Sequence, residues 1–149
     1  MLTVLAIGGN ALQPPDEAAD WRGQVQNVKG LARWIAETKS AGDHVIITHG
    51  NGPQVGALLL QNEMAAETVT ESPLDVLVAQ SQAYTGYALQ LAIENELRKG
   101  GVSASVLPIV TMVTVDPADP AFEQPSKPVG RIYAREEALA LGEKGIATA

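Results

Sequence analysis

The sequence predicts an α/β layered fold built around a parallel sheet. Short apolar runs rich in β-branched residues alternate along the chain with longer segments whose apolar residues recur at helical spacing. The apolar runs are nearly continuous, which is typical of strands in a parallel sheet. The length of 149 residues suits one domain with its own core.

The first half of the chain contains two strand–helix units. Leu2–Ile7 predicts a strand that is buried on both faces. Asp20 predicts the N-cap of a helix that runs to about residue 40. The run 45–48, Val-Ile-Ile-Thr, predicts the second strand.

Two further helices are predicted after the second strand. Pro53 lies in the first turn of a helix that runs to about residue 66, where its missing N–H costs nothing. Ser72 is followed by a proline and predicts the N-cap of a long helix that reaches Lys99. Gly86 lies inside this helix and lets it bend or lets another element approach closely.

The last third of the chain is predicted to be less regular. Residues 103–107 and 110–115 predict two short extended pieces interrupted by Pro108. The stretch 116–130 holds four prolines, which disfavour regular structure there. Residues 133–143 predict a short helix. A sheet of three or four such strands has an open edge.

Composition argues against several classes of function. The net charge of -7 and the six aromatic residues argue against nucleic-acid binding by a basic surface or a stacking platform. The absence of Cys excludes disulfides, a thiolate metal site and a cysteine nucleophile. No stretch approaches the roughly 20 apolar residues of a membrane span, and the N-terminus lacks the pattern of a signal peptide. We therefore expect a soluble, cytoplasmic protein.

Two glycine-rich turns follow the two predicted strands. Gly8-Gly9-Asn10 comes after the first strand, and Gly50-Asn51-Gly52 comes after the second and before a helix. Ligands of open parallel sheets bind beyond the carboxyl ends of the strands, where glycines let backbone N–H groups approach and a helix N-terminus favours an anion. Either turn alone is equally compatible with ordinary turn chemistry. Together they predict a site for one small anionic group.

A cation for this site has to come from elsewhere in the chain. Residues 40–97 contain no Lys or Arg. Lys127 is the best-placed candidate because prolines at positions 125 and 128 stiffen its segment, and the alternative is a solvated surface lysine. His44 and His49 have no acidic or histidine partner at metal-ligand spacing, so no metal site is predicted.

The string Gly50-x-Gly52-x-x-x-Gly56 permits a second hypothesis. It follows a strand and opens a helix, as in some dinucleotide-binding fingerprints. The next predicted element is another helix and not a strand that carries a ribose-binding acid, so this hypothesis ranks second. The chain has no Gly-Lys-Ser/Thr, so any phosphoryl transfer is not of the P-loop kind.

Five strings stand out along the chain, namely residues 6–12 (AIGGNAL), 48–56 (THGNGPQVG), 73–76 (PLDV), 119–122 (DPAF) and 125–130 (PSKPVG). They resemble strings of the carbamate kinase family, which belongs to the amino-acid kinase superfamily. They occur in that family's order and at about its spacing, and the resemblance extends over essentially the whole chain. The string HGNGPQVG and the loop from DPAF to PSKPVG also separate carbamate kinases from acetylglutamate, aspartate and UMP kinases.

The resemblance implies a three-layer αβα sandwich with a mainly parallel sheet, and the reaction ATP + carbamate ⇌ ADP + carbamoyl phosphate with Mg²⁺. Lys127 would reach in from a protruding Pro-rich flap at about 116–132. The residues expected to contact the transferred phosphoryl group are Gly8, Gly9 and Asn10, and those expected on the carbamate side are Gly50, Asn51 and Gly52. The family usually serves ATP formation in arginine breakdown, and a full-length member is expected to be a homodimer.

Members of that family are about twice as long as this chain. The resemblance therefore implies that residues 1–149 correspond to the N-terminal lobe on the carbamate and carbamoyl-phosphate side, without the lobe that binds ATP. We expect the isolated chain to be inactive or nearly so. Two alternatives stay open, namely a non-catalytic anion-binding module or subunit of a split enzyme, and a dinucleotide-binding fragment.

Overall fold

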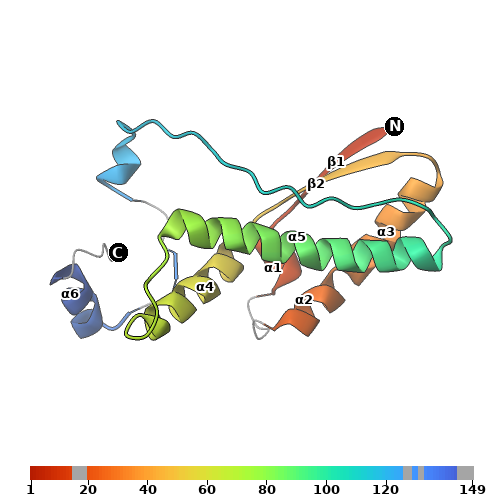
Figure 1. The fold of residues 1–149 in the computed structure, drawn as a ribbon. Coiled ribbons are helices and arrows are strands. Elements are labelled where there is room, and N and C mark those ends of the chain that lie inside the picture. The colour runs from red at the N-terminus through yellow and green to blue at the C-terminus, as the bar shows by residue number, and fades with distance from the viewer. Residues whose placement is uncertain (15–19, 126–128, 131–132, 144–149) are drawn as a thin grey trace.

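The computed structural model describes residues 1–14, 20–125, 129–130 and 133–143, and it places helices against one face of a two-stranded parallel sheet (Figure 1). The predicted α/β class is confirmed. The elements in chain order are β1 (Leu2–Ile7), α1 (Gly9–Leu12), α2 (Trp21–Asn27), α3 (Lys29–Ser40), β2 (His44–His49), α4 (Gly52–Ala65), α5 (Leu74–Lys99), the 3-10 helix η1 (Pro120–Phe122) and α6 (Arg135–Glu143).

The sheet has one packed face and one exposed face. β1 and β2 pair in parallel, with Leu2 opposite His44 and Ile7 opposite His49. Exposed and half-buried residues alternate along both strands. The prediction that the first strand is buried on both faces is wrong, because Val4 on the outer face is 62% exposed. A sheet covered by helices on one side only is an incomplete form of the predicted three-layer αβα sandwich.

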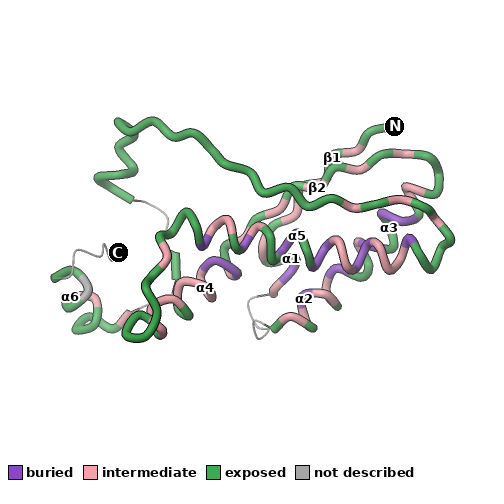
Figure 2. The backbone as a smooth tube through the Cα atoms, viewed as in Figure 1, coloured by how far each residue is buried: buried purple, intermediate pink, exposed green. Residues whose placement is uncertain are grey.

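The core lies between α3, α5 and the inner face of the sheet (Figure 2). Ile35 of α3 is buried together with Leu89 and Ile93 of α5, and Val45 and Ile47 of β2 pack against them. Burying one such side chain stabilises the fold by about 1.5–3 kcal/mol. This packing fixes α5 against the sheet.

The helix predicted from Asp20 to about residue 40 is divided into α2 and α3. The division is at Val28, whose ψ of -1° departs from helical values. Asn27 donates its side-chain Nδ2–H to the carbonyl of Leu12 at 3.2 Å. This bond ties the end of α2 to α1, so a tertiary contact sets the direction of α2.

The predicted N-cap of α2 is confirmed, because Asp20 Oδ1 accepts a hydrogen bond from the N–H of Gly23 at 2.7 Å. We expect Asp20→Ala to lower the free energy of unfolding by about 0.5–2 kcal/mol, since an N–H of the first turn loses its acceptor. Asp20→Asn is the matched control and should keep most of the stability, because an amide oxygen also caps. Urea denaturation followed by circular dichroism measures both variants. Equal losses in the two would contradict the capping role.

The N-cap of α5 is Pro73 and not Ser72, so this part of the prediction is wrong. Ser72 is held by Asn62 of α4 instead. The N–H of Ser72 donates to Asn62 Oδ1 at 2.9 Å, and Asn62 Nδ2 donates to the carbonyl of Ser72 at 3.2 Å. These two hydrogen bonds satisfy the backbone of Ser72 and connect it to α4, ahead of the start of α5.

Residues 103–115 are extended, as predicted, but they form no strand within the described residues (Figure 1). Side chains of α5 hold them. Gln90 Nε2 donates to the carbonyl of Val106 at 2.9 Å, and the N–H of Thr111 donates to Gln82 Oε1 at 2.8 Å. The described sheet therefore has two strands, because this segment is bonded by side chains of a helix and not by a neighbouring strand.

Gly86 of α5 lets the extended segment approach the helix, as predicted. A Cβ built at position 86 would lie 2.8 Å from the Cβ of Pro108, which is closer than non-bonded carbons approach. We expect Gly86→Val to lower the free energy of unfolding by about 1–3 kcal/mol, because the segment has to move away from α5. Chemical denaturation measures the loss.

The control for Gly86→Val removes the Cβ of Pro108, which is the atom that a side chain at position 86 would meet. Pro108→Gly deletes the Cβ that a side chain at position 86 meets, so the double variant should lose less than the sum of the two single losses. A fully additive double-mutant cycle would contradict the contact as the cause.

Residues 116–125 form exposed turns that project away from the helices (Figure 1). Asp116 Oδ1 accepts the N–H of Ala118 at 2.9 Å, and Asp119 Oδ1 accepts the N–H of Ala121 at 2.8 Å at the start of η1. Residues 126–128 and 131–132 of the predicted flap lie outside the described residues.

Candidate functional site

The turns that follow β1 and β2 contact each other directly. A Cβ built on Gly9 would lie 2.9 Å from Cδ of Pro53 and 3.4 Å from the backbone nitrogen of Gly52. A Cβ built on Gly50 would lie 3.1 Å from the backbone nitrogen of Gly9. The parallel register brings the turns together, because the last residues of the two strands are paired. The prediction that both turns lie at one edge of the sheet is confirmed, and Gly8, Gly9, Asn10, Gly50, Asn51 and Gly52 are called the glycine junction below.

Four of the six residues of the glycine junction are glycines, so the groups that these four present are backbone groups. Gly8, Asn10, Gly50 and Gly52 are exposed, while Gly9 and Asn51 are half-buried. The 14-residue helix α4 begins at the junction, and the first N–H groups of a helix have no acceptor within it. The positive end of a helix dipole favours a negative charge at this position.

A residue of α5 holds the side chain of Asn51 in the glycine junction. It occupies the N-cap position of α4 but makes no capping hydrogen bond. Its Nδ2 donates to Ser81 Oγ at 2.5 Å, and Ser81 Oγ donates to the carbonyl of Val78 at 2.6 Å. Ser81 is fully buried, so α5 supplies a rigid support for the amide of Asn51. Ser81 was not among the predicted site residues, because nothing in its local sequence connects it to Asn51.

A buried layer of amide and hydroxyl groups accompanies the first turn of α4. Gln54 Nε2 donates to Gln24 Oε1 at 3.4 Å, and Gln24 Nε2 donates to Gln13 Oε1 at 3.5 Å. Within the described residues, Gln54 Oε1 and Thr85 Oγ1 are buried without a hydrogen-bond partner. An unsatisfied buried polar atom costs about 1–3 kcal/mol, so this layer is not optimised for stability alone.

Lys127 lies outside the described residues, so its predicted position stays a prediction. The chain after it contacts α4. A Cβ on Gly56 would lie 3.6 Å from Cα of Gly130, and a Cβ on Gly130 would lie 3.0 Å from Cδ2 of Leu59. Gly130 has a φ of +97°, which favours glycine. The far end of the predicted flap is thus anchored on the helix that begins at the glycine junction.

This chain is similar to proteins of a known family. Residues 1–147 match the model described as "Amino acid kinase family". The chain belongs to the amino acid kinase family. It is 47% identical over 145 residues to the carbamate kinase of Pyrococcus furiosus. The aligned residues cover 95% of this chain and 46% of that protein. It is 44% identical over 144 residues to carbamate kinase 2 of Enterococcus faecalis. This alignment covers 96% of this chain and 46% of that protein.

Solved structures of family members agree with the sequence comparison. The carbamate kinase of Giardia lamblia bound to AMP-PNP matches with a TM-score of 0.86 and 42% identity, over 97% of this chain and 46% of that chain. The amino-acid kinase fold predicted from the resemblance is therefore confirmed. The chain spans about half the length of the relatives that it matches.

The described part of this family member does not fit a magnesium site of its own. Mg²⁺ prefers carboxylate and water oxygens, and the glycine junction carries no carboxylate. No group of three or more His, Cys, Asp and Glu that could hold a metal occurs in residues 1–14, 20–125, 129–130 and 133–143. The ring Nδ1 of His49 lies 3.1 Å from the carbonyl of Gly50, a distance at which it donates if it carries the proton. The glycine junction therefore offers Mg²⁺ no carboxylate ligand.

Among the residues that the structure describes, the pKa values of Tyr84 and Glu96 are shifted, and both residues lie away from the glycine junction. Burial, followed by the nearby Asp20 carboxylate, raises the pKa of Tyr84. Tyr84 packs edge-on against Trp21 with ring centroids 5.2 Å apart. The hydrogen bond from Lys99 lowers the pKa of Glu96 at the end of α5. Neither group is part of the junction. No helix in the described residues is long and apolar enough to cross a membrane.

Proposed function

We propose that this chain forms the carbamate side of a carbamate kinase-like phosphotransferase, with the reaction ATP + carbamate ⇌ ADP + carbamoyl phosphate. The observation that carries the proposal is the contact between the two glycine turns, with Gly9 and Gly50 packed backbone to backbone. Membership of the amino acid kinase family and the names of its relatives support it. The same proposal includes a cytoplasmic, homodimeric enzyme of arginine metabolism.

A site made of backbone donors suits this chemistry. A carbamate oxygen attacks the γ-phosphorus of ATP, the bond from that phosphorus to the β–γ bridging oxygen breaks, and ADP leaves. Carbamate is already an anion, so no proton has to be removed and no general base is required. The protein has to position the reactants and neutralise the spreading negative charge.

We assign the two sides of the glycine junction to the two reacting groups. The resemblance to the carbamate kinase family implies that residues 8–10 would contact the transferred phosphoryl group. Residues 50–52 would hold the carbamate, with the amide of Asn51 fixed by Ser81 at 2.5 Å. Lys127 would neutralise the phosphoryl group. Gly130 contacts α4, and three residues span at most about 11 Å, so the covalent chain allows this reach.

The nucleotide needs residues beyond those of the junction. ATP or ADP with Mg²⁺ would be bound by the half of a carbamate kinase that this chain does not match. We therefore propose that residues 1–149 alone are inactive. The described residues carry no group of three or more His, Cys, Asp and Glu that could hold Mg²⁺.

Two measurements on the full 149-residue chain test the proposal. Isothermal titration with carbamoyl phosphate should show saturable binding that Asn51→Ala abolishes. Incubation with ADP, Mg²⁺ and carbamoyl phosphate should form no ATP above a protein-free control. Absence of binding would refute the carbamate-side assignment, and ATP formation would refute the inactivity of the isolated chain. Binding that never leads to turnover, even with the other half of a carbamate kinase present, would favour a non-catalytic anion-binding module.

The dinucleotide-binding hypothesis gains no support from the fold. The string at residues 50–56 does open α4, but α4 is followed by the 26-residue helix α5 and not by a strand. Titration with NAD or NADP is expected to give no heat of binding.

We expect Ser81→Ala to weaken carbamoyl phosphate binding by up to about tenfold, because the amide of Asn51 loses the hydrogen bond that fixes it. Ser105→Ala is the matched control, since Ser105 is exposed and makes no hydrogen bond in the described part of the chain. Titration calorimetry compares the two variants, and thermal unfolding checks that both are folded. Equal affinities would show that Asn51 needs no support from α5.

A further inference from the structure

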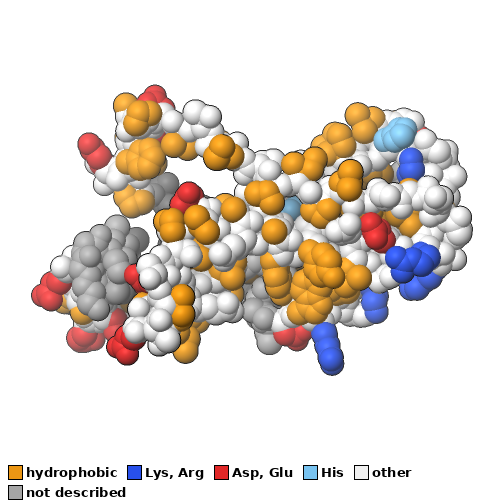
Figure 3. All heavy atoms as spheres, viewed as in Figure 1, with side chains coloured by type: hydrophobic (Ala, Val, Ile, Leu, Met, Phe, Trp, Pro, Cys, Tyr) orange, Lys and Arg blue, Asp and Glu red, His pale blue; other side chains and the backbone are white. Residues whose placement is uncertain are grey.

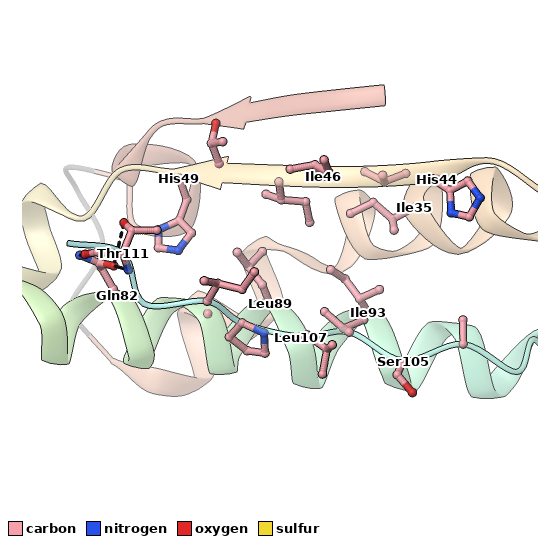
Figure 4. Close-up of a pocket in the computed structure, with 18 of the residues that line it drawn as sticks. Ile35, His44, Ile46, His49, Gln82, Leu89, Ile93, Ser105, Leu107 and Thr111 are labelled. Atoms are coloured by element: carbon pink, nitrogen blue, oxygen red, sulfur yellow. Dashed lines mark hydrogen bonds between the residues drawn. The ribbon is translucent and has the colours of Figure 1, made fainter. Parts of the chain in front are cut away.

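The last residue of β2, His49, turns its ring toward α5 on the inner side of the sheet (Figure 4). Alternate residues of a strand share one face, so the ring lies on the same face as Val45 and Ile47, which pack against the core. There it lines a groove of about 700 Å³ between β2 and residues 104–111. The ring therefore lies at the edge of the core, one residue before the turn 50–52.

This ring holds the carbonyl of the next residue. His49 Nδ1 lies 3.1 Å from the carbonyl oxygen of Gly50. A carbonyl oxygen only accepts, so a hydrogen bond at this contact requires the proton on Nδ1. The N–H of Gly50 donates to the carbonyl of Ile7 at 2.9 Å. Because glycine has no side chain and adopts many backbone conformations, the orientation of Gly50 depends on these two hydrogen bonds.

The bond to the carbonyl also orients an N–H of the glycine junction. The carbonyl of Gly50 and the N–H of Asn51 belong to one peptide unit, and no cis peptide bond occurs in the described residues. In a trans unit the two groups point in opposite directions. With its carbonyl turned toward His49, the unit therefore points the N–H of Asn51 away from the ring.

The two backbone nitrogens that follow Gly50 lie beside Gly9. A Cβ built on Gly9 would lie 3.6 Å from the nitrogen of Asn51 and 3.4 Å from that of Gly52. In the part of the chain that the structure describes, neither N–H donates to another residue, as is usual at the start of a helix. Because Gly9 has no side chain to cover them, these two neighbouring donors are open to a ligand.

Peptide orientation matters at this place because residues 40–97 contain no Lys or Arg. On the face shown in Figure 3, Lys and Arg side chains gather over α2, α3 and the C-terminal end of α5. Within residues 40–97, an anion is attracted by N–H groups and by the dipole at the start of α4. If the peptide between Gly50 and Asn51 turned over, its carbonyl oxygen would face the anion in place of the N–H and would repel it.

We propose that His49 is a positioning residue of the carbamate site. In the tautomer with the proton on Nδ1, it holds the peptide between Gly50 and Asn51 so that the N–H of Asn51 faces the bound anion. The side chain of Asn51 is held separately, by Ser81. His49 and Ser81 thus fix the backbone donor and the side-chain donor of one residue. This inference rests on the proposed function, whereas the tautomer of His49 can be measured without any ligand.

Nitrogen NMR of the histidine rings tests the tautomer. The full 149-residue chain is labelled with ¹⁵N-histidine and measured at about pH 8.5, where an ordinary histidine is neutral. His49 should carry its proton mainly on Nδ1, because the hydrogen bond that a ring nitrogen makes sets the tautomer. His44 is exposed at the start of the same strand and is the matched control, with the proton expected mainly on Nε2 as in free histidine. A proton mainly on Nε2 of His49 would overturn the inference.

Two isosteric variants test the role of His49 in binding. The amide nitrogen of asparagine takes the place of Nδ1, and that of glutamine takes the place of Nε2. His49→Asn should therefore keep the affinity for carbamoyl phosphate within about twofold, whereas His49→Gln should weaken it about three- to tenfold, the range for one hydrogen bond. His44→Gln should bind like the wild-type chain. Titration calorimetry measures the affinities, and thermal unfolding checks that the variants are folded.

The outcomes separate this inference from the proposed function. Equal affinities of His49→Asn and His49→Gln would overturn the role of His49, because a donor at the place of Nδ1 would then make no difference. A loss in His44→Gln as large as that in His49→Gln would also overturn it, since the effect would belong to the whole strand. A wild-type chain that binds no carbamoyl phosphate would refute the proposed function, and the role of His49 would fall with it.

Discussion

Gly9→Ala is expected to weaken carbamoyl phosphate binding by about 10- to 100-fold. The added methyl group would lie 2.9 Å from Cδ of Pro53, 3.4 Å from the nitrogen of Gly52 and 3.6 Å from that of Asn51. It therefore separates the two turns of the glycine junction. Separation of packed groups costs about 1–3 kcal/mol, and each 1.4 kcal/mol corresponds to about tenfold in affinity.

Titration calorimetry with carbamoyl phosphate measures the effect of Gly9→Ala. Gly30→Ala is the matched control, because a Cβ built on Gly30 in the exposed surface of α3 meets no atom within 4 Å. It should bind like the wild-type chain and gain up to about 1 kcal/mol in stability from helix propensity. If Gly9→Ala also binds like the wild type, the contact between the turns does not shape an anion site.

Ile93→Ala is expected to lower the free energy of unfolding by about 2–5 kcal/mol. Ile93 is 1% exposed and belongs to the cluster that joins α3, α5 and the inner face of the sheet. Truncation removes buried methylene groups and leaves a cavity, and both effects destabilise the fold. Because a two-stranded sheet contributes little stability alone, this cluster carries a large share of the fold.

Urea denaturation of Ile93→Ala is compared with that of Ile109→Ala. Ile109 is 79% exposed on the extended segment, so the same truncation should change the stability by less than about 0.5 kcal/mol. Similar losses in the two variants would contradict a core between α3, α5 and the sheet.

The secondary structure of this chain follows closely from local patterns. Pro53 marked the first turn of α4, Asp20 marked the start of α2, and the long helix predicted to reach Lys99 is α5. The boundary at Val28 and the N-cap at Pro73 escaped prediction. In both places a hydrogen bond from a residue distant in sequence takes part, through Asn27 to Leu12 and through Asn62 to Ser72. Such contacts leave no local pattern.

The candidate site likewise has one part that the sequence predicted and another that it did not. The glycine turns were predicted as a pair, because strands in a parallel sheet end at one edge. The support of Asn51 by Ser81 joins residues 30 positions apart, and a serine in an apolar helix has many other uses. The role of Lys127 stays a prediction, since it lies outside the described residues.

By itself, the sequence determined the α/β class, the two strands with a helix after each, and the two turns that resemble those of carbamate kinases. These features depend on residue type and spacing within short windows. Only the tertiary structure decided that the outer face of the sheet is exposed, that Asn51 is held by Ser81, and that a groove lies between β2 and residues 104–111. Each of these depends on which surfaces of distant segments pack together, and a strand with one covered face can have the same apolar sequence as a strand covered on both.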